Sequence, residues 1–215
     1  MSERLLTLEV VDGDGAVRET REAAMKRSDF VRTVFGGGAL VAGGVMLAGL
    51  PALALGAPSA AQDAQILNFA LTLEYLEAEF YTRAVAGGAL RGEALRFARV
   101  VGGHKRAHVR FLRGALGRAA VARPRFDFKG TTEDQAKFLR TAQVLEDTGV
   151  AAYNGQGPLL RRRTLPAAAS VVSVEARHAA WIRDINGAPP APAAFDAARS
   201  RAQVLAAVGR TGFIA

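Results

Sequence analysis

Apolar residues recur every three or four positions through most of the chain after residue 62, which is the period of an α-helix with one buried face. The first such stretch runs from Asp63, a candidate N-cap, to about Val85, and Gly87-Gly88 ends it. A second stretch runs from about Glu93 to Leu116. Its central pair, Gly102-Gly103, disfavours a helix by about 1 kcal/mol per glycine relative to alanine, but it also lets a neighbouring helix approach closely.

Two more helical stretches follow a longer link that contains Pro124. The third begins at Thr132-Glu133-Asp134-Gln135, which has the form of a capping box, and Gly155 and Gly157-Pro158 stop it. The fourth has Pro166 near its first turn and ends at Asn186-Gly187. A link of this length between helices two and three is expected where the two run in the same direction.

A Pro-rich segment then leads to a short helix over about residues 196–208, and Phe213-Ile214 are expected to pack back onto the bundle. No stretch has the alternation of a β-strand. The sequence therefore predicts an all-α fold, an antiparallel four-helix bundle with a long crossover between helices two and three and a short C-terminal helix. We divide the chain into an N-terminal extension (1–61), the bundle (62–187) and a C-terminal tail (188–215).

The N-terminal extension has the form of an export signal. Basic residues from Lys26 to Arg32 precede an uncharged stretch from Thr33 to Gln62, and Ser59-Ala60-Ala61 supply the small residues of a cleavage site. Lys26-Arg27 followed by Phe30 resembles a degenerate twin-arginine signal. An uncleaved membrane anchor is the alternative, although its glycines and Pro51 make it a poor one. We expect the protein in the periplasm, cell envelope or medium, whether translation starts at Met1 or Met25.

The charge is +8, almost all of the positive side chains are arginine, and there is no cysteine. The absence of cysteine excludes disulfides, thiolate zinc sites and iron–sulfur clusters. Because the arginines are scattered along several helical stretches, we predict no nucleic-acid binding, while association with an anionic envelope surface stays open.

One pattern occurs twice. Glu74 and Tyr81, seven residues apart, are followed by Lys105-Arg106-Ala107-His108, and Glu146 and Tyr153 by Glu175-Ala176-Arg177-His178. A carboxylate plus Glu-x-x-His, supplied twice, is how a four-helix bundle builds a two-metal site in its core. The first copy departs from this pattern because Lys105 stands where a carboxylate is expected.

Four blocks of sequence resemble the exported ferritin-like domain family, which includes desiccation-related proteins. They are Asn68–Glu77, Gly103–Val109, Ala142–Tyr153 and Ser173–Ala179. The resemblance covers about 62–215 and implies a ferritin-like bundle. It also implies five metal ligands, with two tyrosines beside the metals. The ligands are Glu74, His108, Glu146, Glu175 and His178, and the tyrosines are Tyr81 and Tyr153.

For such a site the resemblance implies iron or manganese, as one ion, two or none. If metal binds, the implied reaction is oxidation of ferrous iron by oxygen or peroxide, in a protein that protects against oxidation or drying. The alternative is a metal-free structural or stress protein in which Lys105 neutralises the core carboxylates. A homodimer is compatible with the family, and no iron-storing cage is expected.

Three arrangements of Lys105 are open. Its ammonium could pair with Glu74 and Glu175 and replace one metal ion. His104, one turn before His108, could supply the missing ligand instead. Lastly, Lys105 could turn outward and leave five ligands for two weakly held ions. For Glu77 and Glu79 we favour a solvated helix face over a ligand role, and for Tyr81 and Tyr153 a hydrogen-bonded core position over a redox role.

Overall fold

A computed structural model describes residues 58–214. The described chain forms α3 (Ala60–Ala86), α4 (Gly92–Leu116), α5 (Gln135–Gln156), α6 (Leu165–Ile185) and α7 (Arg201–Thr211), with single 3-10 turns at Gly117–Ala119 and Gly157–Leu159. Within this range there is no strand, only one isolated antiparallel bridge between Phe126 and Ile214. The all-α prediction is confirmed. Most of the predicted export signal, up to residue 57, lies outside the described residues. No helix of the described part is both long and apolar enough to span a membrane.

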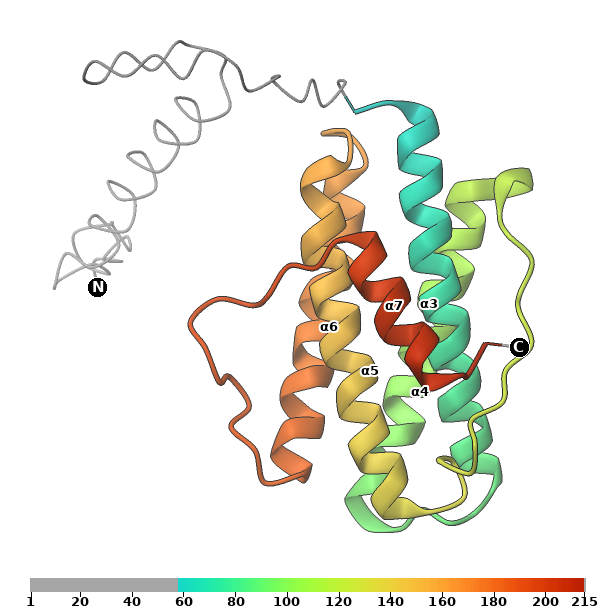
Figure 1. Ribbon diagram of the computed structural model, residues 1–215, viewed down its shortest axis with the longest axis vertical. Helices are drawn as coiled ribbons and strands as arrows, with labels where there is room; N and C mark the ends of the chain where they lie inside the picture. The colour runs from blue at the N-terminus through green and yellow to red at the C-terminus, as the bar shows by residue number, and fades with distance from the viewer. Residues whose placement is uncertain (1–57, 215) are drawn as a thin grey trace, which may run out of the picture. The chain divides into compact units, whose positions relative to one another are not determined.

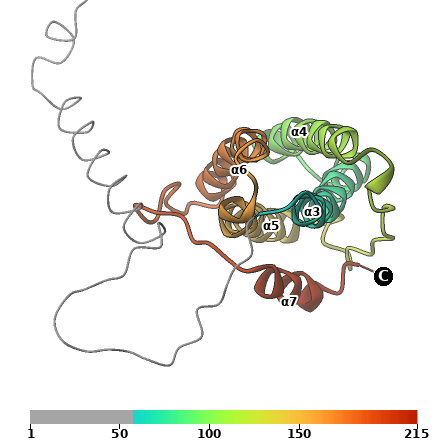
Figure 2. The same ribbon diagram turned by 90° about the horizontal axis from the view of Figure 1, so that it is seen from above.

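The four long helices lie side by side as a bundle, and α7 packs on its outside (Figures 1 and 2). Seen from above, α3 and α4 form one neighbouring pair and α5 and α6 the other, while α7 lies against the side where α3 and α5 meet (Figure 2). The link from α4 to α5 travels back along the bundle, so these two helices run in the same direction, as predicted (Figure 1).

Two helix starts differ from the prediction. The N-cap of α3 is Ser59, whose side chain accepts a hydrogen bond from the Gln62 amide. Asp63 is instead a buried carboxylate that binds the backbone and side chain of Arg161 and the hydroxyl of Thr164. The N-cap of α5 is Asp134, whose side chain accepts from the Lys137 amide. For Asp63, the neighbouring Arg161 and Thr164 take the carboxylate away from the cap position.

Helices α3 and α4 approach closely at Gly102, as expected from the Gly102-Gly103 pair. A Cβ atom there would lie 2.9 Å from Tyr81 Cβ, whereas Gly103 has no such neighbour. Near this contact, Phe80 stacks on Phe138 with ring centroids 5.2 Å apart. At the chain end, Phe213 is buried against Phe128, as predicted, whereas Ile214, predicted to pack with it, is 39% exposed.

The C-terminal tail packs against the last turns of α5. Arg199 donates its backbone N–H to Ala151, and a Cβ atom on Gly155 would lie 1.9 Å from the Arg199 carbonyl oxygen. Gly155, predicted to stop the helix, is therefore inside α5 and makes room for the tail. The last helix begins at Arg201, five residues later than predicted, because Ser200 and Gln203 form a full capping box.

Candidate metal centre

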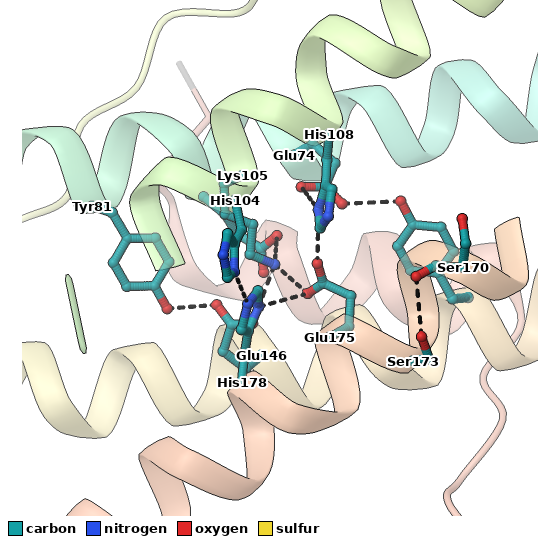
Figure 3. Close-up of polar contacts among 12 residues, drawn as sticks. Glu74, Tyr81, His104, Lys105, His108, Glu146, Ser170, Ser173, Glu175 and His178 are labelled. Carbon is teal, nitrogen blue, oxygen red and sulfur yellow. Dashed lines mark hydrogen bonds and ion pairs between the residues drawn. The ribbon is translucent and has the colours of Figure 1, made fainter. Parts of the chain in front are cut away.

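Side chains from all four long helices converge on one point inside the bundle (Figure 3). Positions three or four apart share a helix face, so each helix can send two groups to the same place. The cluster consists of Glu74 and Glu77 from α3, Lys105 and His108 from α4, Glu146 from α5, and Glu175 and His178 from α6. We call these seven residues the core cluster.

Lys105 is the centre of one half of the core cluster. Its side chain is fully buried. Its Nζ lies 2.7 Å from Glu77 Oε2 and 3.2 Å from Glu146 Oε2, and it also donates to Glu175 Oε2. Burial alone would lower the pKa of the ammonium, but the surrounding carboxylates outweigh burial and hold the pKa well above its usual value. Lys105 is therefore a permanent positive charge in the core.

The other half of the core cluster contains Glu74, His108 and one oxygen of Glu175. His108 Nδ1 lies 3.0 Å from Glu175 Oε1 and 3.4 Å from Glu74 Oε2. All three atoms are buried, yet among the described residues none has a hydrogen-bond partner of good geometry. Ligand atoms of these three residues lie within 4.8 Å of one another. Two carboxylates and an imidazole that converge in this way, in ion-pair contact but without a well-aligned hydrogen bond, fit a single iron or manganese ion.

The ligand atoms of a second group, Glu146, Glu175 and His178, also lie within 4.8 Å of one another. His178 Nδ1 lies 3.3 Å from Glu146 Oε2. Here, however, the two carboxylate oxygens that would face an ion already face Lys105 Nζ. The residues of this half fit an ammonium group, and they do not fit a second ion while Lys105 keeps its place.

Each of the two tyrosines anchors one carboxylate. Tyr81 donates its hydroxyl to Glu146 Oε1 at 2.5 Å, and Tyr153 donates to Glu74 Oε1 at 2.9 Å. Burial, followed by the nearby carboxylates, raises the pKa of both phenols well above the usual value, so both remain donors. The repeated Glu–Tyr spacing of the sequence thus becomes a repeated contact across the bundle, between α3 and α5.

His104 is exposed, and the one hydrogen bond of its side chain within the described residues joins it to His178 of the core cluster. Its Nδ1 lies 2.8 Å from His178 Nε2, and the two rings stack with centroids 5.1 Å apart. Burial, and then the two other histidines, lower the pKa of His104. A neutral His104 can accept the Nε2 proton of His178 and so orient that ring. His104 belongs to neither of the two candidate ligand groups.

The three arrangements considered for Lys105 can now be compared with its position. Lys105 points inward, so the outward arrangement does not describe this structure. It pairs with Glu175, but its other partners are Glu77 and Glu146, and no ion pair with Glu74 is present in the described part of the chain. The reason is axial position, since Glu77 lies nearly one turn further along α3 than Glu74 and level with the Lys105 ammonium.

Glu77 is the site residue that the sequence interpretation placed wrongly. It was expected on a solvated face, yet its exposure is only 4%. The signal was available, because Glu77 is three residues from Glu74 and four from Tyr81 on the same helix face. Glu79 is half-buried, with 16% of its side chain exposed, and it pairs with Arg83 and Arg123 instead of the core cluster.

The pKa values of the groups in the core cluster shift in different directions. Burial raises the pKa of Glu74 and raises that of Glu77 further, whereas the attraction of Lys105 overcomes burial and holds the pKa of Glu175 well below its usual value. Burial would lower the pKa of His108, but Glu175 and Glu74 raise it to about 9. Glu146 and Glu175 likewise raise the pKa of His178 against the effect of burial. Lys105, His108 and His178 thus supply three cations to four carboxyl groups, of which burial makes Glu74 and Glu77 the easiest to protonate.

We expect the metal-free protein to lose stability as the pH rises from about 6.5 to about 9. Folding raises the pKa of His108, so its stabilising contribution is complete below the unfolded value of 6.5 and disappears as the pH passes about 9. His178 acts in the same direction. Urea unfolding midpoints at constant ionic strength would measure the trend, and His108→Gln should flatten it. A midpoint that rises with pH over this window would contradict the assignment.

Comparison with known families matches residues 62–188 to the ferritin-like domain. No curated protein matches the chain significantly. The matched range begins within α3 and ends just after α6, so it contains all four helices of the bundle and every residue of the core cluster. The chain belongs to the ferritin-like domain family.

Proposed function

We propose that this ferritin-like protein binds one divalent metal ion, iron or manganese, through Glu74, His108 and Glu175. In this proposal the Lys105 ammonium takes the place of a second ion. The observation that carries the proposal is the position of Lys105 Nζ, which pairs with Glu146 Oε2 and Glu175 Oε2. Glu74 Oε2 and Glu175 Oε1 face His108 instead of the ammonium. A bound ion would supply Lewis acidity and a one-electron redox couple.

Charge balance supports one ion rather than two. The core cluster has four carboxylates, and all four are at least 95% buried, so their charge must be compensated locally. Lys105 and one divalent ion supply three positive charges, which leaves a single negative charge for a proton or a histidine. Two ions together with Lys105 would supply five. An excess positive charge in a buried site is as costly as an excess negative one.

The neighbouring residues prepare the first half of the core cluster for an ion. Tyr153 holds Glu74 through Oε1, which leaves Oε2 directed toward His108. Lys105 holds Glu175 through Oε2, which leaves Oε1 directed toward His108 as well. Fixing one oxygen of each carboxylate orients the other, as outer hydrogen bonds do at metal sites.

We expect the purified full-length chain to retain about one equivalent of iron or manganese after loading and removal of excess metal. Glu74→Gln should abolish retention, because it removes a ligand charge. Glu79→Gln, which removes a carboxylate outside the core cluster from the same helix, is the matched control and should bind as the parent does. Elemental analysis and calorimetric titration give the stoichiometry. Two equivalents in the parent protein, or equal binding by both variants, would refute the single-ion site.

A metal-free stress-protection bundle is the second candidate, and the contacts of Lys105, His108 and His178 favour it. These three cations nearly neutralise the four carboxylates without an ion. Retention of well under one equivalent of metal would select this candidate over the first. Export, expected from residues 1–61, is part of both proposals, and finding the uncleaved chain retained inside the producing cells would contradict it.

A further inference from the structure

A pocket of about 300 Å³ lies between α3, α4 and the crossover, away from the core cluster. Its volume is at the lower end of the range of small-molecule sites. Arginines dominate its polar lining, and Glu79 is the only acidic residue among the residues that line it. The arginines are Arg106, Arg110, Arg113 and Arg123. Three of them share one face of α4, at spacings of four and three, and the fourth comes from the crossover, so side chains that are scattered in the sequence meet here.

Most of this positive charge is uncompensated. Glu79 pairs with Arg123 and also with Arg83, so its single charge is already shared. Among the described residues, Arg106, Arg110 and Arg113 have no carboxylate within 4.0 Å. Like charges three and four residues apart on one helix repel each other. The repulsion between these arginines therefore destabilises the pocket, and a bound anion would relieve it.

Tyr75 supplies an independent indication of a ligand. The residue is only 5% exposed, and it lines the same pocket. Yet its hydroxyl has no hydrogen-bond partner in the described part of the chain, whereas Tyr81 and Tyr153 each bind a carboxylate. A buried tyrosine hydroxyl normally finds a partner. The Tyr75 hydroxyl is not among the fully enclosed unpaired atoms, and because Tyr75 lines the arginine pocket, a ligand bound there can accept its hydrogen bond.

We propose that this pocket binds a phosphate group, either as free phosphate or as the headgroup phosphate of an anionic lipid. Guanidinium groups form paired hydrogen bonds with planar or tetrahedral oxyanions, and several of them around one concavity match the several oxygens of a phosphate. The Tyr75 hydroxyl would donate to one further oxygen. Ala78 and Val109 supply the apolar part of the lining.

Binding of inorganic phosphate to the full-length chain, measured by calorimetry at low ionic strength, tests the proposal. We expect Arg110→Gln/Arg113→Gln to weaken binding by at least about tenfold. The matched control is Arg140→Gln/Arg177→Gln, which removes the same charge from exposed positions on α5 and α6 and should bind as the parent does. Tyr75→Phe removes only the hydroxyl and should weaken binding by about tenfold. Thermal unfolding would check that each variant is folded.

A second arm uses vesicles of phosphatidylglycerol, compared with vesicles of phosphatidylcholine. Any affinity that residues 1–61 have for membranes is common to all variants, so only the difference between the two double variants is interpreted. Selective loss of phosphate binding in Arg110→Gln/Arg113→Gln supports a free phosphate ligand. Selective loss of binding to anionic vesicles alone supports a lipid headgroup. If the two double variants behave alike in both arms, the pocket is not a phosphate site.

Discussion

Replacing Lys105 with methionine is expected to lower the free energy of unfolding of the metal-free protein by about 3–5 kcal/mol. Methionine has nearly the same length and fits the same space, so packing changes little. The charge is lost, however, and Glu77, Glu146 and Glu175 then face one another without the ammonium that contacts all three. Removing one partner of a buried ion pair leaves the other charges desolvated and uncompensated, which is among the most destabilising single changes.

Urea unfolding of the metal-free protein measures this loss. Lys137→Met is the matched control, because Lys137 is exposed on α5 and its replacement should change stability by less than about 0.5 kcal/mol. Adding Glu77→Gln to Lys105→Met should recover part of the loss, since it removes one of the carboxylates left unpaired. If Lys105→Met were as stable as the Lys137→Met control, Lys105 would not be the charge that holds the core cluster together.

The four-helix bundle and most residues of the core cluster could be predicted from the sequence. Periodicity fixes which side of a helix is buried, and side chains three or four residues apart on that side must point to the same region. The repeated Glu-x-x-His pattern and the resemblance to the ferritin-like family then implied that Glu74, His108, Glu146, Glu175 and His178 meet in the core. The family match supports the same fold.

The sequence was not sufficient to decide which carboxylates Lys105 would contact. That choice depends on how far α4 is shifted along α3, and periodicity within one helix contains no information about such a shift. Glu74 and Glu77 share a face, but only Glu77 lies level with the ammonium. The same limit explains Asp63, which looked like a helix cap until Arg161 and Thr164 proved to be its partners.

The arginine pocket likewise depends on the relative position of two segments, which periodicity within one helix does not determine. Arg106, Arg110 and Arg113 could have been placed on one helix face from their spacing, but Arg123 reaches them only because the crossover returns along the bundle. Counting charges along the chain therefore underestimated how strongly the positive charge is concentrated.

Replacing Lys105 with glutamate is expected to raise the metal stoichiometry from about one ion to about two. The glutamate completes the second Glu-x-x-His pair, because His108 already lies three residues further on the same face. A glutamate side chain is also shorter than lysine, so its carboxylate would end before the position of Nζ and leave that position to an ion. Glu146, Glu175 and His178 already surround this position.

The same change should make stability depend on metal. Without metal, Lys105→Glu has five carboxylates and only two histidines in the core, so we expect the metal-free variant to be less stable than Lys105→Met. With free metal at about a hundred times its dissociation constant, each site restores about 2.7 kcal/mol. Elemental analysis and thermal unfolding with and without metal measure both effects, and Lys137→Glu controls for the charge change at a surface position. A variant that still holds one ion would mean that the Nζ position is not equivalent to a second metal site. A variant that holds none would mean that the ammonium is needed to keep Glu175 directed toward Glu74 and His108.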